Sequence, residues 1–359
     1  MARVGVAAAI LVGTALPGAA EHSFVPLRPV TSDANLPTTS TPGRSVPLDL
    51  DLSPAVTPEI DDADRFWLIS TRGIQTSVAC ATLDPPHLRV SRLDCRGRVF
   101  PSSLDEYLSF RRVERPTVIY VHGNRIDTSA DAIRRALSVY RDIRCYRRCT
   151  NLPSQPIDWV IWSWPSQRES IALKDVRIKA ARTDTQGLYL AWLLREHVRL
   201  NQPTAMIGYS FGGRIVTGAL HALAGGSLRR RSLPGEVILG ARIDVGLVAP
   251  AMEDDWLDVG GYHELATKNI DSISLLYNQQ DVVLKNYWRL NRIRNADALG
   301  YSGPSRFAPR LDGSRVTVLS RDCAAAVGRQ HSELDYYNSR CGGGMVMSHM
   351  IASSLIDNE

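Results

Sequence analysis

The stretch Met206-Ile207-Gly208-Tyr209-Ser210-Phe211-Gly212-Gly213 contains the pattern Gly-x-Ser-x-Gly at a point where two kinds of sequence meet. A short apolar run, Thr204 to Tyr209, comes before the serine, and a helix-like run from Arg214 to Ala224 follows it. This context is typical of a serine on a sharp, strained turn between a strand and a helix. Such a turn lifts the hydroxyl out of the sheet, so Ser210 is a candidate nucleophile.

Two glycines make this turn feasible. Side chains at Gly208 and Gly212 would collide where the backbones of strand and helix cross. The same turn leaves the backbone N–H of Phe211 free to face a negatively charged oxygen. The pattern alone is a weak signal, and its position between a strand and a helix is what favours the nucleophile.

The rest of the 359-residue chain alternates apolar runs with helix-like stretches. An apolar run without polar alternation suits a strand that is covered on both faces, as in a parallel sheet. The sequence therefore predicts one α/β domain: a doubly wound, mostly parallel sheet with helices on both faces. Ligands bind beyond the carboxyl ends of such strands. The expected strands after the first are a short one around His87–Leu93 and then Thr117–Val121, Ile157–Trp164, Thr204–Tyr209, Arg242–Val248, Ser272–Tyr277 and Arg315–Leu319.

The amino-terminal part of the chain has a different composition. An apolar run from Val4 to Leu16, preceded by Arg3 and followed by small residues, predicts a signal peptide over residues 1–20. A Pro/Ser/Thr-rich stretch over residues 21–60 predicts a flexible spacer. Folded structure is expected over residues 61–359, beginning with a strand at Arg65–Ser70. We therefore expect an exported protein that is secreted, periplasmic or held in the cell envelope.

Six cysteines lie after the expected cleavage site, and an even number in an exported chain favours disulfides. They form three pairs that are close in sequence, although fifteen connectivities remain open. A Cys80–Cys95 bond would staple an expected hairpin. Cys323 and Cys341 flank the loop that contains His331, and we predict that they are joined; the alternative is that they pair elsewhere or that one is free.

Several other function classes are disfavoured. The formal charge of +5 is modest, and Arg229-Arg230-Arg231 has few aromatic neighbours, so we expect no nucleic-acid partner. There is no phosphate-binding Gly-x₄-Gly-Lys-[Ser/Thr] motif and no His-Glu-x-x-His. No cysteine–histidine spacing resembles a zinc site. We therefore expect neither a metal nor another cofactor.

A serine nucleophile needs a base, usually an imidazole that a carboxylate orients. In this topology the order along the chain is serine, acid, histidine, which leaves His331 and His349 as candidate bases. His331 lies in a loop after the last strand and is preferred, because His349 lies in an ordinary helix pattern. The preferred acid is Asp281, in the loop after the strand that ends at Tyr277; its rivals follow the preceding strand: Asp254, Asp255 and Asp258.

A negatively charged oxygen also needs a second N–H donor. In this topology that donor comes from the loop after the strand that ends in His122-Gly123, which places it at the backbone of Asn124. His122 itself is expected to support the site rather than to react. Trp164 and Trp256 could line a pocket for an acyl chain, although buried packing is the more common use of either.

These motifs together resemble the α/β-hydrolase fold. The chain is similar to bacterial α/β-hydrolases of unassigned substrate that share Val-His-Gly-Asn and Trp-Ser-Trp-Pro strand ends, here Val121–Asn124 and Trp162–Pro165. The resemblance covers roughly residues 65–349 and implies that Ser210, Asp281 and His331 are nucleophile, acid and base. The cysteine content departs from what that fold requires.

Two functional hypotheses follow. In the first, the chain is an exported serine hydrolase that cleaves small-molecule acyl esters or thioesters through an acyl-enzyme. In the second, it is a non-catalytic α/β-hydrolase scaffold that binds a partner at the cell surface, with the spacer as tether and association with the cell envelope. The complete serine, acid and histidine series favours the first. The sequence does not specify the oligomeric state.

Overall fold

A single mixed sheet forms the centre of the computed structural model, which describes residues 63–94, 98–110, 115–149, 155–170, 172–290, 294–337 and 340–356. The strand order is β11-β10-β9-β6-β4-β5-β1-β2-β3, and neighbouring strands are parallel except where β2 pairs with β1 and β3. The strands are β1 Arg65–Ser70, β2 Arg89–Leu93, β3 Val99–Ser102, β4 Thr117–Val121, β5 Asp158–Ser163, β6 Thr204–Tyr209, β9 Ile243–Val248, β10 Ile270–Tyr277 and β11 Thr317–Asp322.

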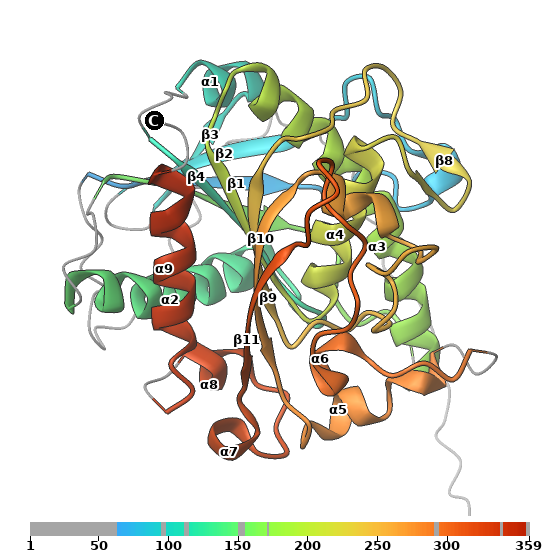
Figure 1. The fold of residues 1–359 in the computed structure, drawn as a ribbon. Helices are drawn as coiled ribbons and strands as arrows, with labels where there is room; N and C mark the ends of the chain where they lie inside the picture. Colours follow the sequence, from blue (N-terminus) through green and yellow to red (C-terminus); the bar gives the residue numbers. More distant parts are fainter. Residues whose placement is uncertain are drawn as a thin grey trace, which may run out of the picture. The chain divides into compact units, whose positions relative to one another are not determined.

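Helices cover both faces of this sheet. Figure 1 shows α2 (Ser129–Cys149) and α9 (Gly343–Ile356) on one side and α3 (Ala172–Arg199) and α4 (Phe211–Leu223) on the other. The helix α4 packs on β6 and β4, whereas α9 packs on β9 and β10. The expected doubly wound α/β sheet is thereby confirmed. A small antiparallel pair, β7 (Ser227–Leu228) and β8 (Arg231–Ser232), follows α4.

The central strands are buried along their whole length. Every residue of β4, β5, β6 and β9 is buried, because helices lie against both faces. Continuous apolar runs suit this environment, which is why these strands could be predicted from the sequence. The edge strand β11 is mostly exposed and begins two residues later than expected, after a turn that Asp312 and Ser314 stabilise.

The helices differ from the sequence pattern at one place. A helical period predicts a helix near Val282–Arg294, but the described residues there form only a four-residue helix, α5 (Val282–Lys285), and a short 3₁₀ turn, Tyr287–Arg289. The pattern Thr128-x-x-Asp131 predicts a capping box before α2, and reciprocal hydrogen bonds between Thr128 and Asp131 confirm it. Periodicity predicts where helices lie better than it predicts their ends.

The loops that follow the parallel strands meet at one edge of the sheet. At the lower end of the molecule in Figure 1, α5, α6 (Leu299–Ser302) and α7 (Ala324–Val327) gather where β10 and β11 finish. The turn after β6 and the loop after β4 belong to the same carboxyl edge, because these strands are parallel. This edge is where the sequence predicted the functional site.

Two sequence predictions concern residues outside this description. The expected signal peptide at 1–20 and the spacer at 21–60 lie outside the described residues, all of which belong to one unit, Leu48–Glu359. Among the cysteines, a Cys323–Cys341 disulfide is present, as predicted. Cys80 is free and exposed, so the predicted staple to Cys95 is wrong; Cys95 itself is not among the described residues.

Candidate active site

Ser210 lies on the predicted sharp turn between β6 and α4. Its backbone has φ 52° and ψ −117°, a strained conformation for a residue with a side chain. A Cβ at Gly208 would approach the carbonyl carbon and oxygen of Gly212 and the nitrogen of Gly213 to 2.7 Å, and one at Gly212 would run into the carbonyl oxygen of Val121. The steric requirement for both glycines is therefore confirmed.

Three predicted residues form a continuous hydrogen-bonded series. The Ser210 hydroxyl lies 3.0 Å from His331 Nε2, and His331 Nδ1 lies 2.6 Å from Asp281 Oδ2. A carboxylate can only accept hydrogen bonds, so Nδ1 carries the proton that is donated to Asp281, and Nε2 is left to accept from the serine. An imidazole in this tautomer is oriented to remove the serine proton.

Asp281 is buried and held from several directions. Its Oδ1 caps α5 by accepting from the backbone N–H groups of Val283 at 2.8 Å and Leu284 at 3.0 Å. Its Oδ2 accepts from His331 and, at 3.4 Å, from the hydroxyl of Tyr336. The short helix α5 therefore holds the carboxylate of Asp281 in place through its first backbone N–H groups.

The rival acids have other partners. Asp254 and Asp258 accept hydrogen bonds from Ser302 and Ser305, and Asp255 pairs with Arg294. Burial raises the pKa of both Asp254 and Asp258. None of these carboxylates has a hydrogen bond to either candidate histidine within the described part of the chain.

The loop that contains His331 is fastened to its surroundings at several points. The Asn278 side chain donates to Gly328 O at 2.7 Å, and the Tyr209 hydroxyl donates to His331 O at 3.1 Å. The rings of Tyr209 and His331 stack with centroids 5.2 Å apart. The alternative base, His349, is exposed on α9.

The two predicted N–H donors lie in neighbouring segments. Phe211 is the first residue of α4, where backbone N–H groups have no acceptor within the helix. Asn124 follows Gly123, and a Cβ at Gly123 would lie 3.1 Å from Ser210 Cβ, so this loop passes directly beside the serine. The role of Asn124 as a donor stays a prediction.

Arg72, immediately after β1, holds the loop after Asn124. Its guanidinium donates to Ile126 O at 2.8 Å, to Asp127 O at 3.0 Å and to the Ser163 hydroxyl at 2.9 Å. The supporting roles of Arg72, Asn278 and Tyr209 could not be predicted from the sequence. Tyr209 lies inside the Gly-x-Ser-x-Gly pattern, but its hydrogen bond to His331, like the contacts of Arg72 and Asn278, joins segments far apart in the chain.

His122 is a structural residue, as expected. Its Nδ1 donates to Gly123 O at 2.8 Å, and its Nε2 accepts from the backbone N–H of Trp164 at 3.3 Å. Burial lowers the pKa of His122 to about 3, so the ring is neutral at physiological pH. Trp164 stacks on this ring and is fully buried, so it serves packing and does not line a pocket.

Neither a metal site nor a membrane span is found in the described ranges. No group of three or more His, Cys, Asp or Glu side chains in them could hold a metal ion. Of the helices that are described, none combines the length and the apolar character needed to cross a bilayer.

The chain has the α/β-hydrolase fold: a mostly parallel sheet with helices on both faces and a serine on the turn after a central strand. No protein-family model and no curated protein matches the sequence.

Similar solved structures include a phosphonate-inhibited esterase B from Lactobacillus rhamnosis, at 12% identity and TM-score 0.36, with 82% of this chain and 87% of that chain covered. They also include the Est2 esterase from Thermogutta terrifontis, at 10% identity and TM-score 0.29, with 68% and 82% covered. A third is an esterase from Pyrobaculum calidifontis, at 13% identity and TM-score 0.29, with 76% and 80% covered. Likeness at this level says nothing about the reaction of this chain.

Proposed function

We propose that this chain is a serine hydrolase that cleaves carboxylic esters or thioesters through an acyl-enzyme. The observation that supports it is the hydrogen-bonded series of Ser210, His331 and Asp281, on a turn whose strain is typical of a nucleophile. All three residues come from different loops at one edge of the sheet. A purely structural reason for such a convergence is hard to supply.

In the proposed reaction, Ser210 Oγ attacks the carbonyl carbon while its proton passes to His331 Nε2. The tetrahedral oxyanion accepts hydrogen bonds from the N–H groups of Phe211 and Asn124. The intermediate collapses, the bond to the leaving oxygen or sulfur breaks, and His331 gives its proton to that atom. Water then repeats both steps on the acyl-enzyme and releases a carboxylic acid. Asp281 keeps the imidazole oriented throughout.

We also propose that the chain is exported, with residues 1–20 as a signal peptide and 21–60 as a spacer before the hydrolase domain at 61–359. The Cys323–Cys341 disulfide supports this, because disulfides persist mainly in oxidising compartments. Sequencing the amino terminus of protein recovered outside the cytoplasm tests the proposal. A mature chain that begins at Glu21 is expected, and a chain that keeps Met1 would contradict it.

The catalytic proposal is tested by a fluorophosphonate label and by hydrolysis of 4-nitrophenyl acyl esters of graded chain length. Ser210→Ala should abolish labelling and lower kcat by about 10⁴-fold or more without unfolding the protein. His331→Ala should cost about as much, since the two residues act as one unit. Asp281→Asn should lower kcat near neutral pH.

His349→Ala is the matched control and should leave kcat unchanged. A Ser210→Ala protein with activity within tenfold of the wild type would refute the assignment. A wild-type protein that neither reacts with the label nor hydrolyses any ester would instead favour the non-catalytic binding module.

A further inference from the structure

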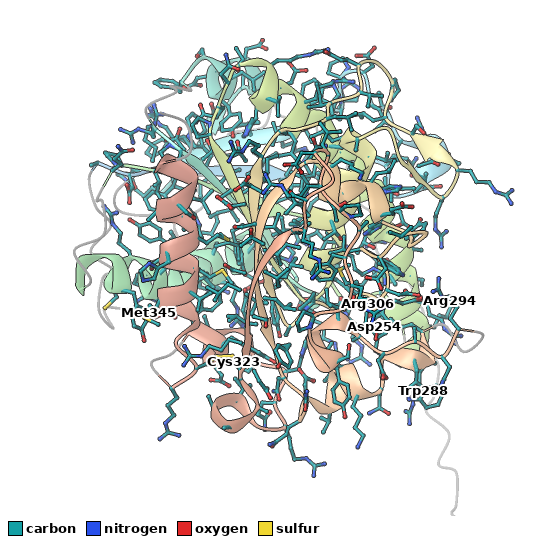
Figure 2. The ribbon with its side chains drawn as sticks, viewed as in Figure 1. Asp254, Trp288, Arg294, Arg306, Cys323 and Met345 are labelled. Atoms are coloured by element: carbon teal, nitrogen blue, oxygen red, sulfur yellow. A yellow bond between two sulfur atoms is a disulfide. The ribbon has the colours of Figure 1, made fainter. Side chains whose placement is uncertain are left out.

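A pocket of about 480 Å³ lies between α3, the beginning of α4 and the segments that follow β9 and β10. Its lining includes Arg214 of α4, Trp256 after β9 and Tyr287 after β10. Figure 2 labels Trp288 and Arg294, which belong to this part of the chain, at the lower right beside α3. The pocket is therefore at the same edge of the sheet as Ser210.

The pocket is lined by more cations than anions. Four arginines face two carboxylates, namely Arg177, Arg214, Arg229 and Arg294 against Asp184 and Glu253. Both carboxylates already have an arginine partner: Arg229 Nε lies 3.0 Å from Asp184, and Arg294 Nε lies 3.0 Å from Glu253. Arg177 and Arg214 form no salt bridge with either carboxylate, although the charge of Arg214 acts on Asp184 and opposes the rise that burial causes in the pKa of that carboxyl group.

Arg214 is the more unusual of the two because it is 8% exposed. It forms no salt bridge with any described residue and donates to neutral acceptors only. Nε donates to the Thr183 hydroxyl at 3.0 Å, one terminal nitrogen to the Tyr287 hydroxyl at 2.7 Å, and the other to Ala180 O at 3.3 Å. A guanidinium has five N–H groups, so one on each terminal nitrogen is not used in these bonds.

The guanidinium is also held in one orientation. Its central carbon lies 4.3 Å from the centre of the Trp256 ring and 5.5 Å from the centre of the Phe211 ring. Asp184 is a nearby counter-charge, but it forms no hydrogen bond with Arg214, and a planar fork of two free N–H groups matches a carboxylate. An oriented, buried guanidinium with two free N–H groups that lines an open pocket is a candidate site for an anion.

This site is close to the candidate nucleophile. Arg214 follows Ser210 by four residues, about one helical turn or roughly 6 Å along the axis of α4. Its guanidinium also covers the side chain of Phe211, whose N–H is the candidate oxyanion donor. The guanidinium and the turn of the candidate nucleophile therefore belong to the same end of α4.

We propose that the pocket binds a carboxylate on the ester substrate, with Arg214 as the residue that recognises it and Arg177 at the exposed rim adding to the attraction. The substrate class is then a monoester of a short dicarboxylic acid. The catalytic part of this inference, the substrate class, rests on the proposed hydrolase function. The binding of a carboxylate in the pocket does not depend on that function.

Binding is tested with the full protein by calorimetric titration with glutarate and with its neutral diamide, glutaramide. Glutarate should bind at least tenfold more tightly than glutaramide, and more weakly at high salt. Arg214→Met should weaken glutarate binding by about 10- to 100-fold, the loss expected for a hydrogen-bonded charge pair. Arg98→Met is the matched control, since Arg98 is exposed and pairs with Asp94 on the β2–β3 hairpin; it should bind as the wild type does.

If Arg214→Met does not fold by circular dichroism, Arg177→Met decides, because Arg177 is exposed and its loss threatens no packing. It should weaken glutarate binding at least threefold and leave glutaramide unaffected. Equal affinity of the wild type for both compounds, or unchanged glutarate binding in a folded Arg214→Met protein, would overturn the proposal.

The catalytic part is tested by comparing kcat/KM for the 4-nitrophenyl monoester of glutaric acid and for 4-nitrophenyl butyrate. Arg214→Met should lower kcat/KM for the glutaric acid monoester at least tenfold more than kcat/KM for 4-nitrophenyl butyrate. Hydrolysis of both esters with the same loss in the variant would refute the substrate class while the hydrolase stands. Binding of glutarate through Arg214 without hydrolysis of either ester would refute the hydrolase while the carboxylate site stands.

Discussion

At the scale of single residues, the turn at Ser210 requires glycine at positions 208 and 212, because a side chain at either would collide with backbone. A methyl group at Gly212 would meet the backbone of Val121, which cannot move without disturbing β4. That Ser210, Asp281 and His331 come together could be predicted because their order along the chain and their positions after strands limit the choices, whereas their catalytic roles stay a proposal. Arg72 and Asn278 could not be predicted, since their contacts depend on how distant loops pack.

Gly212→Ala should therefore destabilise the protein strongly, by about 3 kcal/mol or more, because overpacking against backbone cannot be relieved by a rotamer change. Gly313→Ala is the matched control. Gly313 has φ +82° and nothing within 4 Å of an added Cβ, so only the backbone strain of about 1–2 kcal/mol applies. Urea unfolding of both variants gives the comparison. Equal losses of unfolding free energy would show that the crossing at Gly212 is not tight.

Glu333, two residues after His331, is a second residue whose surroundings determine its chemistry. It is buried, and the hydroxyl of Tyr120 donates to both carboxylate oxygens, at 2.8 and 2.9 Å. Arg135 lies 3.8 Å away, and the nearby Tyr209 and Tyr337 are also buried. Burial raises the pKa of Glu333 from its ordinary 4.5 to about 7, against the opposing effects of Tyr120 and Arg135.

The sign of the resulting pH dependence follows from proton binding. Between pH 4.5 and about 7 the folded protein holds the Glu333 proton that the unfolded chain has lost. This contribution to stability is therefore complete below pH 4.5 and is lost as the pH rises through 7, on the order of 3 kcal/mol in all. Glu333→Gln should remove this loss of unfolding free energy with rising pH. Urea unfolding at pH 4.5, 6 and 7.5 measures it, and parallel pH profiles for wild type and variant would contradict the assignment.

At the scale of elements, the loop from β11 to α9 had the least sequence signal and yet contains His331, the proposed base. Its cysteines gave the one usable constraint, because they flank His331. The bond between Cys323 and Cys341 joins the end of β11 to the start of α9, and both residues are buried. Short helices such as α5 and α8 (Glu333–Tyr337) escape periodicity, because one turn does not show a repeat.

Removing this disulfide should slow turnover as well as lower the free energy of unfolding. Closing a loop of this size contributes on the order of 3 kcal/mol in the chain-entropy model, and the restraint acts where His331 must stay within reach of Ser210. The double variant Cys323→Ser, Cys341→Ser should lower kcat at least threefold with little change in KM. Cys80→Ser, which removes a free and exposed cysteine, is the control and should change neither. An unaltered kcat in the double variant would show that the hydrogen bonds from Asn278 and Tyr209 position the loop by themselves.

At the scale of the whole molecule, the mostly parallel sheet could be predicted because buried parallel strands leave long apolar runs, and each helix between them has its own period. The order of the strands could not be predicted, because it depends on contacts between distant segments. The strand β3 and the exposure of β11 could not be predicted either, since edge strands carry mixed sequence. The parallel direction of the strands determines which edge of the sheet is the carboxyl edge, and it therefore also determines where the candidate site lies.

The amino-terminal boundary of the folded domain is set by the contacts of the residue just before β1. Asp64, just before β1, is buried: its Oδ1 accepts from the backbone N–H of Ile157 at 2.8 Å, and its Oδ2 accepts from the Tyr140 hydroxyl at 2.5 Å. Arg144 Nε lies 3.6 Å from the same carboxylate. Asp64 therefore ties the start of β1 to β5 and α2, and the domain needs the chain from this residue onward.

A chain of residues 61–359 should keep the proposed esterase activity, and its free energy of unfolding should lie within about 0.5 kcal/mol of that of a chain that begins at residue 21, because distant surface changes rarely cost more. A chain of residues 65–359 should lose about 2–4 kcal/mol, since it leaves the hydroxyl of Tyr140 and the buried guanidinium of Arg144 without their carboxylate. Asp64→Ala in the 61–359 chain separates the loss of the carboxylate from the change of terminus and should cost a similar amount. If the 61–359 chain is itself several kcal/mol less stable than the longer one, residues 21–60 contribute to the fold, and their assignment as a spacer is wrong.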